Sequence, residues 1–183
     1  MNIAVRYYSQ FGRTKTIAEE MADELGVKAS SVVDEPVLKE HVDVLFLGGA
    51  PYLSIMDPAL EEYVNGLDPN MVGCVVLFTT SNWSHRTAIG MRVKLEERGI
   101  RVAPGHFYAH MAAIGQSKAS ARAYAREAAE KAAQIAEAAE HEAPADKGSR
   151  VKEFAVEAAS VAAFSAVVIV SVVVARRLFK LRS

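Results

Sequence analysis

The sequence contains a single cysteine, Cys74, and this scarcity excludes several classes of site. One cysteine cannot form an internal disulfide, and it cannot supply a multi-cysteine zinc or iron–sulfur centre. Cys74 lies within the apolar run 72–78, so we expect it to be a small buried side chain.

Clustered positive charge is missing from residues 1–140, which contain 14 Lys and Arg against 18 Asp and Glu. A nucleic-acid backbone is held by a basic patch, so we expect this part of the chain to bind no nucleic acid. Residues 141–183 contain 7 Lys and Arg against 4 Asp and Glu. The two parts carry formal charges of −4 and +3, so a mildly acidic domain precedes a basic tail.

Familiar catalytic and targeting patterns are also missing. The histidines are scattered without metal-ligand spacing, so no metal site is predicted. No nucleophile-elbow sequence is found, and no catalytic residue is assigned. The N-terminus lacks the charged start and long apolar region of a signal peptide, so we expect the domain to remain in the cytosol.

What the sequence does contain is a regular alternation of strand and helix patterns. Apolar, β-branched runs predict strands at 2–8, 27–33, 42–48, 73–79 and 101–108, and amphipathic patterns predict helices at 14–25, 37–41, 58–64, 85–98 and 117–141. The runs at 42–48 and 73–79 are almost continuously apolar, which is typical of parallel strands covered on both faces. The pattern therefore predicts an α/β doubly wound sheet of five parallel strands with helices on both faces.

Ligands of such sheets bind beyond the carboxyl ends of the strands, so the loops after Tyr8, Gly48 and Thr79 should share one site. The first loop places hydroxyl groups and a glycine between a strand and a helix. Backbone N–H groups there, together with the positive end of the helix dipole, suit a phosphate group. The predicted phosphate-binding residues are Ser9, Gln10, Phe11, Gly12, Arg13 and Thr14.

This loop resembles the signature of the flavodoxin family, aromatic-x-Ser-x-x-Gly-x-Thr-x-x-x-Ala-x-x-apolar. The matching residues are Tyr7, Ser9, Gly12, Thr14, Ala18 and Met21. The resemblance covers about residues 1–140 and implies a flavodoxin-like fold that binds flavin mononucleotide (FMN). Two positions depart from the family: Phe11 stands where a hydroxyl is usual, and Arg13 stands where a small polar residue is usual. Arg13 either adds a charged bond to the phosphate or points into solvent.

The resemblance also implies that the two later loops enclose the flavin ring. The residues assigned to it are Pro51, Tyr52, Leu53 and Ser54 in one loop, and Thr80, Ser81, Asn82 and Trp83 in the other. Tyr52 and Trp83 are the candidates for stacking on the ring. The alternatives are that Tyr52 only packs on Pro51 and that Trp83 packs against the helix near His85. His85 itself is either a proton donor beside the flavin or an ordinary surface histidine.

The tail has its own pattern. Residues 158–175 contain no charged side chain and are followed by Arg176 and Arg177, which predicts a membrane-spanning helix. The expected organisation is a flavodoxin-like domain at 1–142, a polar linker at 143–153, a transmembrane helix at 154–177 and a short basic tail at 178–183. Basic residues flank the span on both sides, and we expect a single-pass anchor with the domain facing the cytoplasm.

Together these observations predict a membrane-anchored flavodoxin-like electron carrier or small oxidoreductase. Its expected partners are a redox protein or quinone at the membrane and the lipid bilayer itself, and its oligomeric state is open. One alternative resembles the flavodoxin-fold, quinone-dependent protoporphyrinogen oxidases, although the segment 79–85 is short for that group. An alternative of another class is a non-redox scaffold tethered to the membrane.

Overall fold

The computed structural model describes residues 1–52 and 55–141, in which five parallel strands form one sheet in the order β2-β1-β3-β4-β5. The strands are β1 (Ile3–Tyr7), β2 (Ala29–Ser31), β3 (Val42–Gly49), β4 (Val72–Ser81) and β5 (Phe107–His110). The helices are α1 (Arg13–Leu25), α2 (Pro58–Gly66), α3 (Arg86–Glu97) and α4 (Ile114–His141), with short 3-10 turns at η1 (Pro69–Met71) and η2 (Met111–Ala113). The predicted doubly wound parallel sheet is confirmed.

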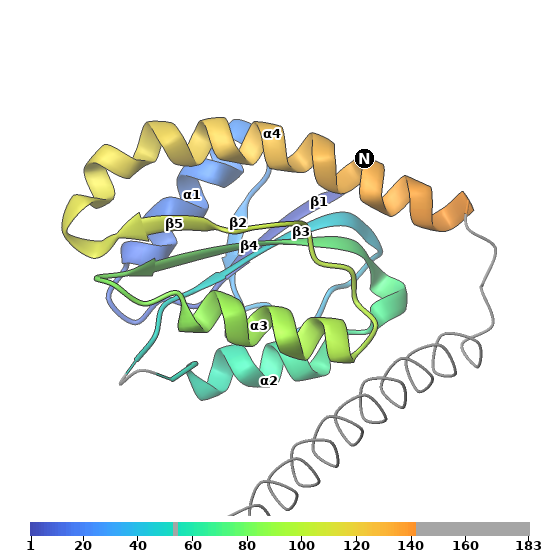
Figure 1. Ribbon diagram of the computed structural model, residues 1–183, viewed down its shortest axis with the longest axis horizontal. Coiled ribbons are helices and arrows are strands. Elements are labelled where there is room, and N and C mark those ends of the chain that lie inside the picture. Colours follow the sequence, from blue (N-terminus) through green and yellow to red (C-terminus); the bar gives the residue numbers. More distant parts are fainter. Residues whose placement is uncertain (53–54, 142–183) are drawn as a thin grey trace, which may run out of the picture. The chain divides into compact units, whose positions relative to one another are not determined.

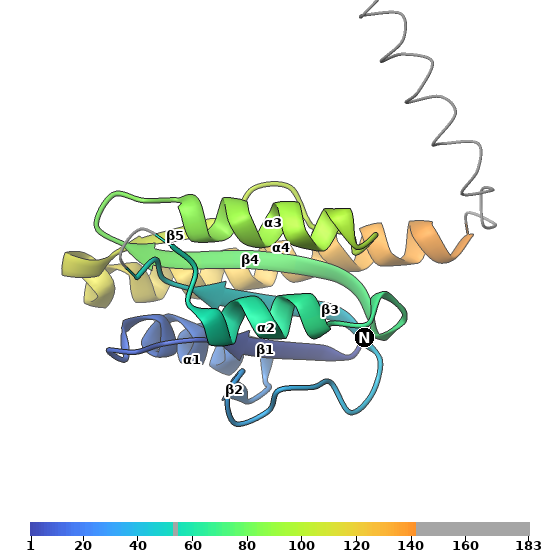
Figure 2. The same ribbon diagram turned by 90° about the horizontal axis from the view of Figure 1, so that it is seen from below.

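Helices cover both faces of this sheet (Figure 1). On one face, α1 and α4 pack against strand residues such as Val44, Phe46 and Val76. On the other face, α2 and α3 lie side by side (Figure 2) and pack against the alternate strand residues, including Leu45 and Leu77. Because successive side chains of a strand point to opposite faces, both sets of residues are buried, which explains the continuous apolar runs.

The long helix α4 runs antiparallel to the strands on the same face as α1. A stripe of alanines on α4 is buried against the sheet. The helix comes so close to β4 that a Cβ added at Gly73 would lie only 2.8 Å from Cβ of Ala136. Since Gly73 lies near the start of β4, the C-terminal part of α4 lies at the amino end of the sheet. Lys118 and Arg122 of α4 bind the carboxylate of Glu20 on α1 at 2.8 and 2.6 Å. These two hydrogen bonds hold the pKa of Glu20 below its ordinary value.

Two predicted elements differ from the structure. The short helix expected at 37–41 is wrong, because residues 32–41 form turns and irregular chain. Backbone N–H groups of Asp34 and Glu35 bond to Ser31 O, and the Glu35 carboxylate pairs with Arg6. Within residues 37–41 only Leu38 packs against the core, so a helix there would bury little apolar surface to stabilise it.

The last strand begins later than the predicted 101–108. Val102 makes only an isolated bridge to Val75, and the chain then leaves the sheet until Phe107. Pro104 has no N–H to donate, and Gly105 turns the backbone with a φ of 72°. The result is a short edge strand preceded by a bent segment.

The predicted linker at 143–153, the transmembrane helix at 154–177 and the basic tail at 178–183 lie outside the described residues. None of the helices within residues 1–52 and 55–141 combines the length and apolar character that a membrane span requires.

Candidate functional site

The order of the strands places a switch point between β1 and β3. From β1 the chain first moves outward to β2 and then crosses to β3 on the other side, so the loops after β1 and β3 diverge. In the register of the sheet, Tyr7 of β1 pairs with Gly48 of β3, and Gly49 of β3 pairs with Thr79 of β4. The three predicted loops therefore leave the sheet at the same end, where the carboxyl ends of these strands lie. In open α/β sheets this crevice is where ligands bind.

The loop after β1 ends in a helix start that is suited to an anion. Gly12 is the N-cap residue of α1, with a φ of 79°, and there is open space where a Cβ would stand. In the described part of the chain, no side chain caps this terminus, and the first turn of α1 contains no acidic residue. The N–H groups of the first turn therefore remain available to a bound anion, and the helix dipole favours one.

Ser9 supplies the observation that points most directly to a ligand. Its Oγ is buried and has no hydrogen-bond partner among the described residues. A buried polar atom without a partner destabilises a protein by about 1 to 3 kcal/mol, so such atoms usually have a role. A phosphate oxygen at the start of α1 would satisfy this hydroxyl. The residues present therefore fit the phosphate group of FMN.

Thr14 links the first loop to the end of β4. Its side chain is 1% exposed, and its Oγ1 lies 2.7 Å from Oγ1 of Thr80. Each hydroxyl can donate one hydrogen bond and accept others, so the pair retains capacity to bind a ligand. The structure thus brings together two residues that are 66 positions apart and that the sequence assigned to different parts of the site.

Tyr52 lies closer to the phosphate loop than the sequence suggested. Its hydroxyl accepts a hydrogen bond of 2.7 Å from the Gln10 N–H. Its ring packs edge-on against Tyr8 and at an angle against Phe11, with centroids 5.9 and 6.0 Å away. Burial raises the pKa of Tyr52, so the hydroxyl keeps its proton at neutral pH. Tyr52 therefore joins the second loop to the first.

Trp83 presents an open aromatic surface at the third loop. Its side chain is 85% exposed, and its ring makes an edge contact with His110, with centroids 4.8 Å apart. Ser81 holds this loop in shape, because its Oγ donates to Ser84 O at 2.6 Å and accepts from Ser84 N at 2.8 Å. The sequence left open that Trp83 packs against α3, whereas in the structure its aromatic contact is with His110 on β5.

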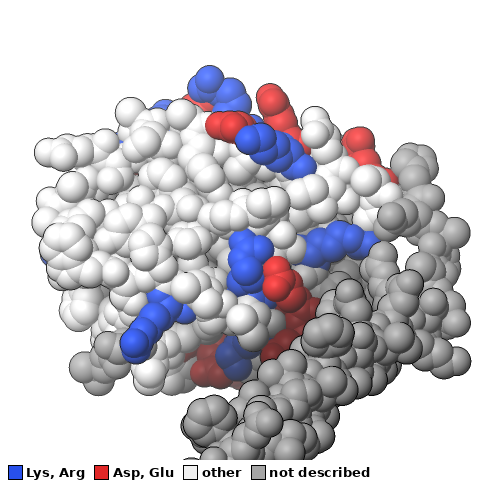
Figure 3. Space-filling model, viewed as in Figure 1, with Lys and Arg blue, Asp and Glu red and all other residues white. Residues whose placement is uncertain are grey.

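The other predicted site residues are placed as follows. Phe11 and Arg13 are exposed, Pro51 is half-buried, and Asn82 is exposed on the third loop. Leu53 and Ser54 lie outside the described residues. Figure 3 shows few charged side chains toward the end of the molecule where β4 and β5 end.

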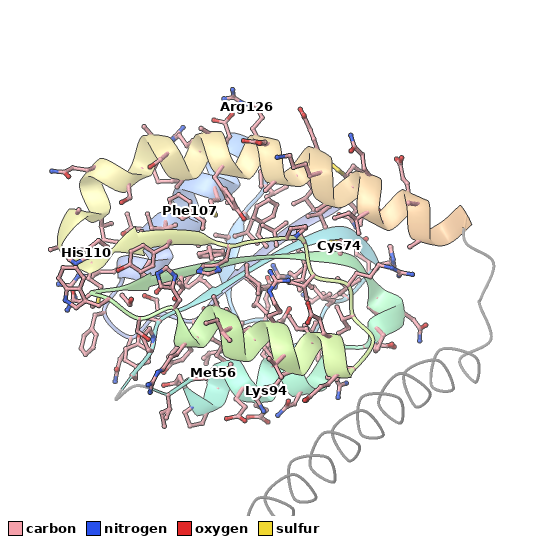
Figure 4. The ribbon with its side chains drawn as sticks, in the orientation of Figure 1. Met56, Cys74, Lys94, Phe107, His110 and Arg126 are labelled. Carbon is pink, nitrogen blue, oxygen red and sulfur yellow. The ribbon has the colours of Figure 1, made fainter. Side chains whose placement is uncertain are left out.

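The sequence singled out His85 near the predicted flavin site, but it did not indicate that His106 and His110 lie near the same loop. His85 and His106 share a hydrogen bond, and His110 lies against Trp83 at the end of β5 (Figure 4). These residues looked scattered because the spacing of ligands along one helix or strand was the pattern sought. For His85 and His110 the signal was their position at the carboxyl ends of β4 and β5, whereas His106 lies at the amino end of β5. No cluster of three metal-binding side chains is found in the described part of the chain.

No protein-family model and no curated protein matches the sequence. The structure is similar to that of a flavodoxin from the domain Archaea, with a TM-score of 0.61 and 18% identity over 72% of this chain and 99% of the other. The chain has the flavodoxin fold.

Two further solved flavodoxins support this assignment of the fold. Oxidised flavodoxin 1 from Bacillus cereus has a TM-score of 0.60 and 14% identity, over 71% of this chain and 98% of that one. A Fusobacterium nucleatum flavodoxin mutant bound to flavin mononucleotide has a TM-score of 0.55 and 16% identity, over 70% and 95% of the two chains. At sequence identities this low, the similarity to these proteins shows the fold alone.

Ser9→Ala tests whether the unpartnered hydroxyl is a ligand for phosphate. The change removes a buried polar atom, so the free energy of unfolding of the ligand-free protein should not fall. The affinity for FMN should fall about 10- to 100-fold, as expected for a hydrogen bond to a charged group, while that for riboflavin should not change. Fluorescence titration measures both affinities, with Ser120→Ala as the control. Equal losses for the two ligands would contradict the assignment.

Proposed function

We propose that this chain binds FMN and transfers electrons between a donor protein and an acceptor at a membrane to which it is tethered. The observation that supports this most is the phosphate cradle, in which the unpartnered Ser9 hydroxyl and the uncapped start of α1 lie at the switch point of a flavodoxin fold. When bound, FMN supplies the redox chemistry, and the protein supplies binding, orientation and electrostatics.

The residues of the first loop would hold the phosphate. Ser9 and Thr14 offer hydroxyl groups, and the N–H groups at the start of α1 offer further donors. The hydroxyl that the family usually has at position 11 is replaced by Phe11. The Tyr52 hydroxyl accepts from the Gln10 N–H, which is therefore not free for the phosphate, and the proton of that hydroxyl would be offered to a phosphate oxygen instead.

The ring of the flavin would lie against the third loop. The exposed indole of Trp83 offers a stacking surface, and aromatic pairs of this kind contribute about 0.5 to 1.5 kcal/mol beyond burial. Residues 82–85 connect β4 to α3, and this short connection leaves little room for the additional structure expected of a protoporphyrinogen-oxidase-like enzyme. An electron-transfer role is therefore preferred over that alternative.

The membrane tether rests on the sequence of residues 154–177. An uncharged stretch of 18 residues, 158–175, spans about 27 Å as a helix, close to the thickness of a bilayer core. Confinement to a membrane raises the effective concentration of partners in that membrane without any new contact. A quinone or a membrane redox protein is the acceptor that such a tether favours, with the domain on the cytoplasmic side.

FMN content is the first test of this proposal. Purified full-length protein should be yellow, and heat should release one FMN per chain, identified by chromatography. If the protein is colourless and added FMN neither binds nor raises its melting temperature, electron transfer is contradicted. The scaffold alternative, which Phe11 in the phosphate loop favours, would then be preferred.

Tyr52→Phe tests the role of the tyrosine hydroxyl. If the hydroxyl binds phosphate, the affinity for FMN should fall about tenfold, a typical loss for one hydrogen bond to a charged group, while the affinity for riboflavin is kept. If Tyr52 only stacks on the ring, phenylalanine would preserve both affinities and contradict this assignment. Tyr124→Phe removes a tyrosine hydroxyl from α4 and serves as the matched control.

Removal of residues 143–183 tests the tether. Residues 1–141 form a compact unit, so the shortened protein should fold and bind FMN with unchanged affinity. On cell fractionation the full chain should sediment with membranes and resist extraction by high salt, whereas the shortened protein should remain in the supernatant. The same distribution for both proteins would contradict the membrane anchor and leave FMN binding unaffected.

A further inference from the structure

Two histidines share a hydrogen bond beside the candidate site. Nδ1 of His85 lies 2.7 Å from Nε2 of His106, although the residues are 21 positions apart. His85 precedes α3, and His106 precedes β5. A neutral imidazole has one N–H donor and one acceptor nitrogen, so one ring donates to the other. The two rings therefore form a coupled pair, and the binding of a proton to one affects the other.

The pair is held in place from both sides. The ring of His85 stacks on Tyr108, with centroids 4.4 Å apart and an interplanar angle of 32°. On the other side, the Arg92 guanidinium donates 2.7 Å hydrogen bonds to the carbonyl oxygens of Ala103 and Gly105, which fixes the segment leading to His106. His85 is exposed and His106 is half-buried, so a pair held in this way can still exchange protons with water.

The pair is also connected to the third loop of the site. The Tyr108 hydroxyl donates to Ser81 O at 3.0 Å, so the residue on which His85 stacks also holds the loop before Trp83. Trp83 stands two positions before His85 in the same loop. The ring of His110, which is labelled in Figure 4, makes an edge contact with Trp83 at the end of β5. A flavin ring stacked on Trp83 would therefore lie on the loop that also carries His85.

The surroundings favour a neutral pair in the absence of added charge. Burial, followed by the proximity of His85 and Arg92, lowers the pKa of His106 from its ordinary 6.5. Arg92 is itself paired with Glu96 at 3.2 Å, and Arg86 follows His85 at the start of α3. Tyr108 is the titratable group on the β5 side. Within the described residues, the one histidine that pairs with a carboxylate is His41, with Asp43. A negative charge that appeared near His85 and His106 would therefore be the first to attract a proton to them.

We propose that the His85–His106 pair is a redox-linked proton site, which takes up one proton from water when FMN at the neighbouring site is reduced. This inference rests on the proposed function. Two electrons arrive from a donor protein, or from dithionite in vitro, and add negative charge to the flavin. The proton forms an N–H bond on one imidazole, the positive charge is shared across the hydrogen bond, and the hydroxide left behind is neutralised by the buffer. The physical cause is the attraction between opposite charges, which favours the protonated pair.

The test is the midpoint potential of the bound FMN as a function of pH. A tenfold change in proton concentration shifts a two-electron couple by about 30 mV for each proton taken up. In the wild-type protein, the plot of midpoint potential against pH should therefore be steeper by about 30 mV per pH unit over one range of pH. This range begins below pH 6.5, where the pair loses its proton while the flavin is oxidised, and it ends where the pair loses its proton while the flavin is reduced. His106→Gln should lack this extra slope. His41→Gln should retain the extra slope, because His41 directly precedes β3 and so lies at the amino ends of the strands, away from the site.

A second measurement needs no flavin. In the ligand-free protein, His85→Gln should raise the pKa of His106, measured by NMR of the imidazole signals, because a neighbouring imidazole that lowers it has been removed. FMN absorption and affinity should be unchanged in both variants, which shows that they fold. If wild-type protein and His106→Gln give the same slope, or the pKa of His106 does not respond, this inference is overturned while FMN binding stands. A chain that binds no FMN overturns the proposed function as well.

Discussion

The candidate site depends on one physical constraint, the N–H groups at the start of α1 that have no partner within the helix. A side-chain cap would satisfy some of them, yet Gly12 stands at the cap position and has no side chain to offer. Several features of the site lie next to this terminus. Ser9 and Thr14 provide hydroxyl groups in the same segment of the chain, and Tyr52 and Thr80 connect the loop after β3 and the end of β4 to it.

Much of this arrangement could be predicted from the sequence because it is encoded locally. The apolar runs of β3 and β4, with helical patterns between them, are sufficient to predict parallel strands covered on both faces. Once the strands are parallel, their carboxyl ends must share an edge. The grouping of Ser9, Tyr52 and Thr80 therefore follows from topology, before any distance is known. The phosphate loop is contiguous, so its residues could be assigned individually.

The features that could not be predicted depend on contacts between distant segments. Residues 37–41 have a weak helical pattern, but only Leu38 among them packs against the core, and the Glu35–Arg6 pair holds the preceding turn. The contacts of Tyr52 with Gln10 and Phe11 join two loops that are distant in the sequence, and its stacking on a flavin ring stays a prediction. The histidine pair depends on the bend at Pro104 and Gly105, which Arg92 fixes from α3. No pattern within a single segment indicates which side chains such a bend brings together.

The direction of α4 has a geometric consequence for the proposed tether. This helix contains 28 residues and so extends for about 42 Å, from the edge of the sheet that holds the candidate site toward the amino ends of the strands. A chain that continues beyond His141 therefore starts at the far side of the domain from Trp83. Residues 143–153, fully stretched, reach at most roughly 40 Å, about the length of α4 itself. With the proposed tether, the site would reach an acceptor in the membrane only when the whole domain turns, and the length of residues 143–153 would limit how often this happens.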